Sequence, residues 1–199
     1  MTAIELLGLA GSLSLLAGWR LYLCLFAAGV AMSMGWIAAP EHLAWLGVLH
    51  NPWVIGASFL GLVAELLADK IAWVDSLWDA IHTAIRPVGG ALLALAIVDP
   101  QDPAWQVTAF LLGGGAALLS HSAKAGTRAV VNASPEPFSN VVVSTGEDLT
   151  TGALLVAALA SPVLAVVVCI LLLLATLGML ILLRRLLRRI SGKVRRQAD

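Results

Sequence analysis

The run of residues 163–183, VLAVVVCILLLLATLGMLILL, contains no charged side chain. A helix needs about 20 apolar residues to cross the hydrocarbon core of a bilayer, so this run predicts a transmembrane helix. The whole chain has the same character, because 60% of its residues are hydrophobic and only 12% are charged. Soluble domains have about a quarter of their residues charged. The sequence therefore predicts an all-α, polytopic membrane protein.

Apolar runs divide the chain into about seven predicted membrane segments. They are residues 4–17, 21–37, 53–68, 88–98, 104–122, 152–160 and 163–183. Several are short for a full crossing, and short or Gly/Pro-interrupted segments often mark a binding site in membrane proteins. We expect the segments to form one membrane domain, residues 1–183, followed by a basic cytoplasmic tail, residues 184–199.

The basic residues are concentrated at the C-terminus, although the formal net charge is zero. Seven of the twelve lie in the last sixteen positions: Arg184, Arg185, Arg188, Arg189, Lys193, Arg195 and Arg196. Basic residues that flank a spanning helix stay on the cytoplasmic side, so we expect a cytoplasmic C-terminus and an outside location for loop 99–103. The tail is a topology signal or, alternatively, a binder of anionic lipid headgroups. It lacks the base-reading and stacking residues that nucleic-acid binding requires.

Two segments of the chain match without gaps. Residues 12–20, SLSLLAGWR, align on residues 120–128, SHSAKAGTR, with the shared pattern S-x-S-x-x-A-G-x-R. The arginine is informative because charged side chains are rare at membrane depth. Each copy is followed by acidic residues, Glu65 and Asp69 in one half and Glu147 and Asp148 in the other. The match predicts an internal duplication, with halves 1–99 and 104–183, and leaves parallel and inverted arrangements open.

The repeat predicts a site for an anion. Gly and Ser at a helix end leave backbone N–H groups free, and an Arg fork matches a carboxylate or phosphate. The candidate anion-binding residues are Arg20, Lys124, Arg128, Ser12 and Ser120. The candidate counter-ions or proton couplers are Glu65, Asp69, Glu147 and Asp148. Alternatively, the arginines anchor helix ends at the interface, and the Glu147–Asp148 pair caps a helix.

Residues 71–86 are amphipathic and rich in Trp, and we expect them to lie along a surface or in a junction, with Pro87 opening the next helix. Asp75, Asp79, His82 and Arg86 fall on one stripe of such a helix. Asp75, Asp79 and His82 are weak candidate metal ligands, but Arg86 on the same stripe would repel a cation. Ion pairing with Arg86 is favoured, so no metal site and no cofactor are predicted.

Residues 132–140 contain two prolines, which forbid a regular helix. Non-helical backbone at membrane depth is tolerated only where it is buried in protein or lines a water-filled cavity. This stretch therefore predicts a re-entrant element near Arg128 or, alternatively, a surface loop.

Three motifs carry a resemblance to a known family. They are residues 64–83, AELLADKIAWVDSLWDAIHT, residues 124–128, KAGTR, and residues 134–140, SPEPFSN. With these motifs the chain resembles the bacterial membrane family catalogued as domain of unknown function 4126. The resemblance covers nearly the whole chain up to residue 183 and implies a small multi-helix protein of the bacterial inner membrane. It implies no established activity and no site residues.

These observations favour a small transporter or carrier for an anionic solute or a lipid phosphate headgroup. The alternative is a non-transporting membrane scaffold whose charges form structural ion pairs. An enzyme is the third alternative and is not expected, because no catalytic fingerprint is present and Asp75, Asp79 and His82 would be its only candidate site. The expected partners are membrane lipid and the anion, with a homo-oligomer left open and no nucleic acid.

Overall fold

A computed structural model describes residues 2–38, 41–133 and 137–198 of the chain. Within these residues the protein consists of seven α-helices and one 3-10 helix, without strands. In chain order they are α1 (Ala3–Trp19), α2 (Leu21–Ser33), η1 (Ala44–His50), α3 (Pro52–Ala68), α4 (Ala72–Val98), α5 (Pro103–Asn132), α6 (Pro137–Ala160) and α7 (Pro162–Ala198). The predicted all-α class is confirmed.

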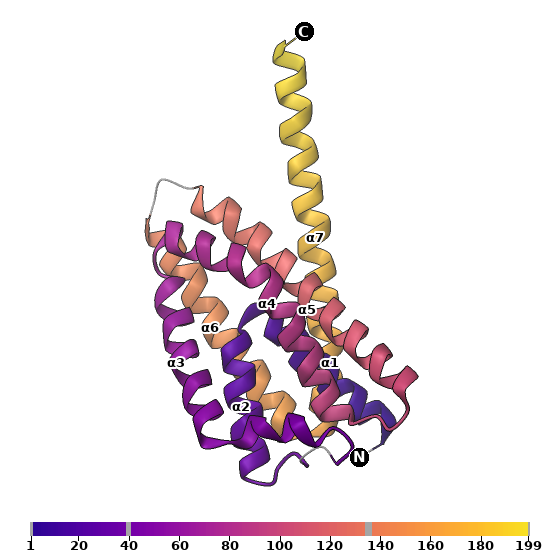
Figure 1. The fold of residues 1–199 in the computed structure, drawn as a ribbon. Helices are drawn as coiled ribbons and strands as arrows, with labels where there is room; N and C mark the ends of the chain where they lie inside the picture. The colour runs from indigo at the N-terminus through magenta and orange to yellow at the C-terminus, as the bar shows by residue number, and fades with distance from the viewer. Residues whose placement is uncertain (1, 39–40, 134–136, 199) are drawn as a thin grey trace.

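Polar side chains mark several helix boundaries. Thr2 and Glu5 form a capping box at the start of α1. Asn51 and Asp102 cap the first turns of α3 and α5, each followed by a proline at the start of the helix. Asp99 ends α4 in the left-handed conformation (φ 42°), and its carboxylate accepts backbone N–H groups of the loop before η1. These capped helix ends lie at the lower end of the bundle as Figure 1 shows it.

The helices of the bundle suit a membrane by length and composition. Among the described helices, α4, α6 and residues 162–189 of α7 are long and apolar enough to cross a membrane, and η1 with α3, bent by 60°, would make a fourth span. α1 and α2 are apolar but shorter. Large apolar side chains cover the outside of α3 and α7, where Leu60, Leu67 and Leu174 are more than half exposed. Lipid is the solvent that such a surface requires.

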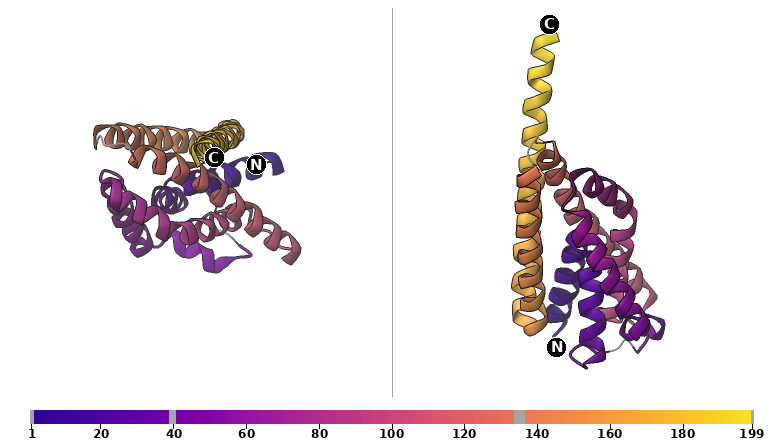
Figure 2. Two further views of the ribbon diagram at one scale, coloured as in Figure 1. Left: turned by 90° about the horizontal axis from the view of Figure 1, so that it is seen from above. Right: turned by 90° about the vertical axis from the view of Figure 1, so that its left-hand side faces the viewer.

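A central hairpin, α1–α2, organises the packing. Figure 2 shows α6 and α7 on one side of it and α3 and α4 on the other. The main core cluster is built on α1, with Leu13, Leu16 and Leu93 completely buried. In Figure 1 the open ends of α1 and α2 lie at the same end of the bundle, and their turn lies inside it. The first two predicted segments therefore enter and leave from one end, as a short hairpin.

Helix boundaries near proline differ from the prediction. Residues 71–86 and 88–98 belong to one helix, α4, with Pro87 inside it, so the expectation that Pro87 opens a new helix is wrong. A proline inside a membrane helix is tolerated where neighbouring helices accommodate the freed carbonyl and the local bend. Here Pro87 packs against Gly114 of α5, where a Cβ would lie 3.1 Å from the Pro87 carbonyl oxygen. α4 curves midway along its length (Figure 1).

The chain between the predicted segments 104–122 and 152–160 is more helical than expected. α5 continues to Asn132, and α6 begins at Pro137, so Glu147 and Asp148 lie inside α6 and do not cap a helix. Residues 134–136 of the predicted re-entrant element lie outside the described residues. The rest of that element forms the end of α5 and the start of α6.

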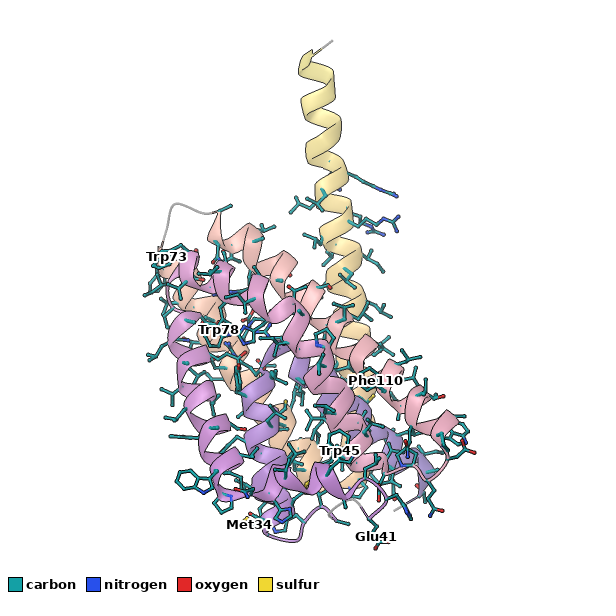
Figure 3. All side chains as sticks on the ribbon, in the orientation of Figure 1. Met34, Glu41, Trp45, Trp73, Trp78 and Phe110 are labelled. Atoms are coloured by element: carbon teal, nitrogen blue, oxygen red, sulfur yellow. The ribbon has the colours of Figure 1, made fainter. Side chains whose placement is uncertain are left out.

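The two ends of the bundle differ. Trp73 lies at the end from which α7 projects, whereas Trp45, Met34 and Glu41 lie at the opposite end (Figure 3). Trp73 is 71% exposed and Trp45 59%. Exposed Trp side chains at both ends match the aromatic belts at membrane–water interfaces. The α4–α5 connection lies at the end opposite to the C-terminus (Figure 1).

Candidate functional site: a buried cluster of charged side chains

All five basic residues that precede the C-terminal tail gather in one place, together with six acidic residues. We call this set the charged cluster: Arg20, Glu65, Asp69, Lys70, Asp75, Asp79, Arg86, Lys124, Arg128, Glu147 and Asp148. Eight of the eleven are at most 5% exposed: Arg20, Glu65, Asp69, Asp75, Asp79, Arg86, Lys124 and Arg128. Ionisable side chains at membrane depth are costly unless paired, so this gathering is the feature of the fold that most requires explanation.

Arg20 forms the tip of the α1–α2 hairpin. Its backbone (φ −141°, ψ 78°) ends α1 and starts α2, so a helix break places the side chain inside the protein. The guanidinium pairs with Asp69 through Nη1 and with Asp148 through Nη2. Glu147 is further away, with Oε2 3.9 Å from Nη2. Arg20 therefore joins the α3–α4 connection to the middle of α6.

The basic residues of both repeat copies converge on Asp69. Lys124 Nζ lies 3.4 Å from Asp69 Oδ2, the oxygen that also pairs with Arg20. Arg128 donates from Nη2 to the Asp69 carbonyl oxygen at 2.8 Å and from Nε to Asp75 Oδ2 at 2.9 Å. The structure thus brings Arg20, Lys124 and Arg128 together. Each of them already faces a carboxylate.

The two repeat copies also pack against each other, with α1 and α5 running in the same direction (Figure 1). Ser120 donates its hydroxyl to the Leu15 carbonyl at 2.7 Å, and Lys124 donates to the Trp19 carbonyl at 3.2 Å. A Cβ on Gly18 would lie 1.8 Å from Ser120 Oγ. Small residues at this crossing let the backbones approach closely.

Two expectations about the repeat do not match this geometry. Arg128 lies inside α5, one turn before its end, so only Arg20 occupies a helix end. Ser12 donates its hydroxyl to Leu9 of its own helix at 2.9 Å and does not reach the cluster. Ser120 holds α1 against α5. The small residues of the motif thus serve helix packing, and its basic residues serve the cluster.

A second part of the cluster surrounds Arg86. Its guanidinium donates to Glu65 Oε1 at 2.9 Å and to the Gly18 carbonyl at 3.1 Å, and Nη1 lies 3.1 Å from Asp79 Oδ1. Glu65 thus pairs with Arg86, and not with either arginine of the repeat. The predicted pairing of Asp79 with Arg86 is present, but Asp75 pairs with Arg128, and His82 contacts Tyr22 and Trp78 in place of Arg86.

Two histidines beside Arg86 have tautomers fixed by their partners. A guanidinium has no acceptor, so Arg86 is the donor to His121 Nδ1 at 2.6 Å. His121 therefore carries its proton on Nε2. That nitrogen lies 3.0 Å from the Thr83 hydroxyl and 3.2 Å from the Asp79 carbonyl oxygen. In His82, Nδ1 donates to the Trp78 carbonyl at 2.8 Å, and Nε2 lies 3.2 Å from the Tyr22 hydroxyl. Because its Nδ1 accepts from Arg86, the His121 ring is neutral in this arrangement.

Sequence reasoning missed three members of the network. Lys70 pairs with Asp148 at 2.7 Å and donates to Ser144 at 2.5 Å. Asn140 donates to the Asp69 carbonyl at 3.1 Å. His121 was detectable, because it lies inside the second repeat copy, whereas Lys70 and Asn140 carried no signal beyond their closeness to Asp69 and the SPEPFSN motif.

The cluster is open at one edge. The side chains of Lys70, Asp148 and Glu147 are 32%, 20% and 12% exposed. A cleft of about 200 Å³ between α4 and α5 also reaches it, and Asp79, Arg128 and Asn132 contribute to its lining. The cluster thus reaches the surface at Lys70, Asp148 and Glu147, and the cleft approaches its buried part.

Six carboxylates face five cations, so the cluster carries one negative charge when every group is ionised and both histidines are neutral. Asp69 Oδ1 and Asp75 Oδ1 are buried and accept no hydrogen bond from the described residues. The cluster is neutral when it holds a single proton.

The weak candidate metal ligands are separated by their partners. Asp75 accepts from Arg128 and Asn132, Asp79 pairs with Arg86, and His82 binds Tyr22. Among the described residues no group of three or more His, Cys, Asp or Glu side chains is arranged to hold a metal ion.

Comparison with known proteins gives one match. The model of a protein family described as Domain of unknown function (DUF4126) matches residues 7–182. No curated protein and no solved structure matches the chain. The whole charged cluster lies within the matched residues, whereas the basic tail lies outside them. The description names no reaction, and nothing in the cluster points to catalysis.

Proposed function

The chain belongs to the family described as Domain of unknown function (DUF4126), and from its charged cluster we propose that it is a small membrane carrier for an anion. The anion is a small solute or the phosphate headgroup of a lipid. The observation that carries the proposal is the gathering of all five basic residues of the membrane domain around buried carboxylates.

The energetic argument is one of cost. An arginine at the centre of a membrane helix costs at least about 2.5–3.5 kcal/mol, and buried ion pairs often fail to repay the desolvation of both partners. Apolar residues would hold the same helices together without that cost. A cluster of eleven charged residues therefore supports a functional role.

In the proposed mechanism the anion takes the place of a carboxylate. Asp148 is partly exposed and pairs with both Arg20 and Lys70. When Asp148 is protonated, its hold on these cations weakens, and an incoming anion of one charge restores the balance. Proton and anion then enter together, and the net charge of the cluster is unchanged.

The orientation and location belong to the same proposal. The seven basic residues of the tail favour a cytoplasmic C-terminus. A cytoplasmic C-terminus together with a bacterial inner membrane, as the resemblance implies, would place the open edge of the cluster, at Lys70 and Asp148, in the cytoplasmic half of the protein.

The test is transport by purified protein in liposomes. Uptake of radiolabelled inorganic phosphate is measured with an imposed pH gradient, and movement of a fluorescent phospholipid between leaflets is measured in parallel. We expect wild-type activity in one assay, at least a tenfold loss for Arg20→Lys, which keeps the charge but loses the fork, and loss of the pH dependence for Asp148→Asn. Gly115→Ala, at a glycine with open space around it, is the matched control. Normal activity of Arg20→Lys would sink the proposal.

The alternative is a scaffold, and one observation favours it: each of the five cations pairs with a carboxylate. Activity of the wild type in the liposome assays separates the two, and the variant Arg20→Ala/Asp148→Ala tests the ion pair. In a scaffold it should regain the thermal stability that Arg20→Ala loses, and there is no activity to lose. A carrier should regain stability and remain inactive.

A further inference from the structure

A groove of about 480 Å³ lies between the end of α5 and α7, away from the charged cluster. Its apolar lining comes from Val130 and Val131 of α5 and from Met179, Leu182, Leu183 and Leu186 of α7. The helices touch beside it, where a Cβ on Gly126 would lie 2.2 Å from Leu183 Cδ2. Its volume falls in the range of about 300–1,000 Å³ that is usual for small-molecule sites.

The groove has a charged rim of one sign. Arg185 and Arg189 line it, and no acidic residue among those that the structure describes does so. They are four positions apart on α7, so they lie on one face and about 6 Å apart along the axis. They directly follow the uncharged run that ends at residue 183, which places them at the level where lipid headgroups begin.

We propose that this groove binds one anionic phospholipid. Its acyl chains lie against the apolar lining, and its phosphate is held by Arg185 and Arg189. Charge complementarity selects this occupant, because a zwitterionic headgroup would place a positive charge beside two guanidinium groups. The proposal is independent of the proposed transport, since it uses no residue of the charged cluster.

The chain offers a matched control. Arg184 and Arg188 belong to the same helix and carry the same charge, but they do not line the groove. General attraction of the tail to anionic lipid would depend equally on both pairs, whereas a bound lipid depends on the pair at the rim. Val130→Trp is the complementary variant, because it fills the groove and leaves all arginines in place.

The experiment is native mass spectrometry of the purified full chain in detergent, titrated with phosphatidylglycerol or, separately, phosphatidylcholine. We expect one phosphatidylglycerol retained by the wild type in preference to phosphatidylcholine. Arg185→Gln/Arg189→Gln should weaken it at least tenfold, since each basic residue near the headgroup contributes about 1 kcal/mol. Val130→Trp should weaken it similarly, and Arg184→Gln/Arg188→Gln by no more than about threefold.

Three results would overturn the proposal. Equal losses for the two arginine pairs would mean diffuse attraction by the tail. Undiminished binding to Val130→Trp would mean that the lipid lies elsewhere. A dimer that Val130→Trp dissociates would mean that a second copy of the chain occupies the groove. Each variant is first checked for a single symmetrical peak in size-exclusion chromatography, and Val131→Trp replaces Val130→Trp if that variant fails to fold.

Discussion

Glu65 and Arg86 form an ion pair between two completely buried side chains. Their other contacts are unequal. Among the described residues Glu65 has Arg86 as its sole ion-pair partner, whereas Arg86 also pairs with Asp79 and donates to the Gly18 carbonyl. Because of this asymmetry, removing Arg86 leaves Glu65 without an ion-pair partner, whereas removing the charge of Glu65 leaves Arg86 paired with Asp79. Comparing the two variants tests how much an unpaired buried charge costs in stability.

We predict that Arg86→Met destabilises the protein by about 3–5 kcal/mol, because it leaves Glu65 buried and unpaired. Glu65→Gln should cost less, about 1–3 kcal/mol, since Arg86 keeps Asp79 and can still donate to the amide oxygen. Arg86→Met/Glu65→Met should recover part of the loss. Thermal unfolding in detergent, followed by Trp fluorescence, measures all three. A loss in the double variant as large as that of Arg86→Met alone would contradict the prediction.

Gly18 gives a second prediction at this scale. A Cβ there would lie 1.8 Å from Ser120 Oγ and 2.4 Å from the Ala117 carbonyl oxygen, and the backbone oxygen cannot rotate away. Gly18→Ala should therefore push α1 from α5 and cost at least about 1–3 kcal/mol. Gly115→Ala, on α5 with nothing within 4 Å, should be neutral or slightly stabilising. Equal melting temperatures for the two variants would argue against the close crossing.

At the scale of the helix, sequence patterns predicted which segments are helical better than where each helix begins and ends. Apolar runs located α1, α3 and the membrane part of α7, because a membrane helix must be mostly apolar along its length. The stripe formed by Asp75, Asp79, His82 and Arg86 was also predictable, since helical periodicity places these residues on one face. Pro87 misled the prediction, because the neighbouring helix determines whether a proline breaks a helix or bends it.

The charged cluster was predictable in composition but not in pairing. The repeat indicated that Arg20 and Arg128 belong together, and Asp69 joins them. Which carboxylate meets which cation depends on the tilt and rotation of helices that are distant in sequence. Glu65, for example, is 45 residues from Arg20 and 21 from Arg86, and no local pattern favours the second.

The α1–α2 hairpin leads to a prediction about accessibility. α1 has 17 residues and α2 has 13, about 26 and 20 Å long, and both are shorter than a hydrocarbon core of about 30 Å. A cysteine at the turn, Leu21→Cys, should stay unlabelled by a membrane-impermeant maleimide from either side. Met34→Cys, beyond α2 and 60% exposed, should label from one side. Fast labelling of Leu21→Cys from the side of the tail would indicate two full crossings.

That labelling experiment needs a background without reactive thiols. Cys24 is fully buried, and Cys169 is partly buried beside Gly11 of α1. Replacing both by alanine removes little volume, and unchanged thermal stability of the doubly substituted protein is the control. Labelling of Met34→Cys in the same preparation shows that the reagent reaches the protein.

In the molecule as a whole, the charges in the interior differ in arrangement from those at the two ends. The five basic residues of the membrane domain are paired inside, so the positive charge that can set orientation lies in the tail. At the opposite end of the bundle, residues 99–103 carry two acids and no base. The two ends thus differ in sign, and the fold places them on opposite sides (Figure 1).

The resulting prediction concerns orientation in the membrane. In intact cells, Gln101→Cys should react with an impermeant maleimide from outside, because Gln101 is exposed in the α4–α5 connection and caps no helix. Arg188→Cys, exposed on α7 beyond the apolar run, should react only after the membrane is permeabilised.

The positive charge of the tail is the expected cause of this orientation. Replacing Arg184, Arg185, Arg188 and Arg189 together by Gln should therefore yield a mixed population, in which some Gln101→Cys is protected from the reagent. Labelling of Arg188→Cys in intact cells would place the tail outside. Orientation would then have to come from the helices themselves, and the open edge of the charged cluster would lie in the outer half of the protein.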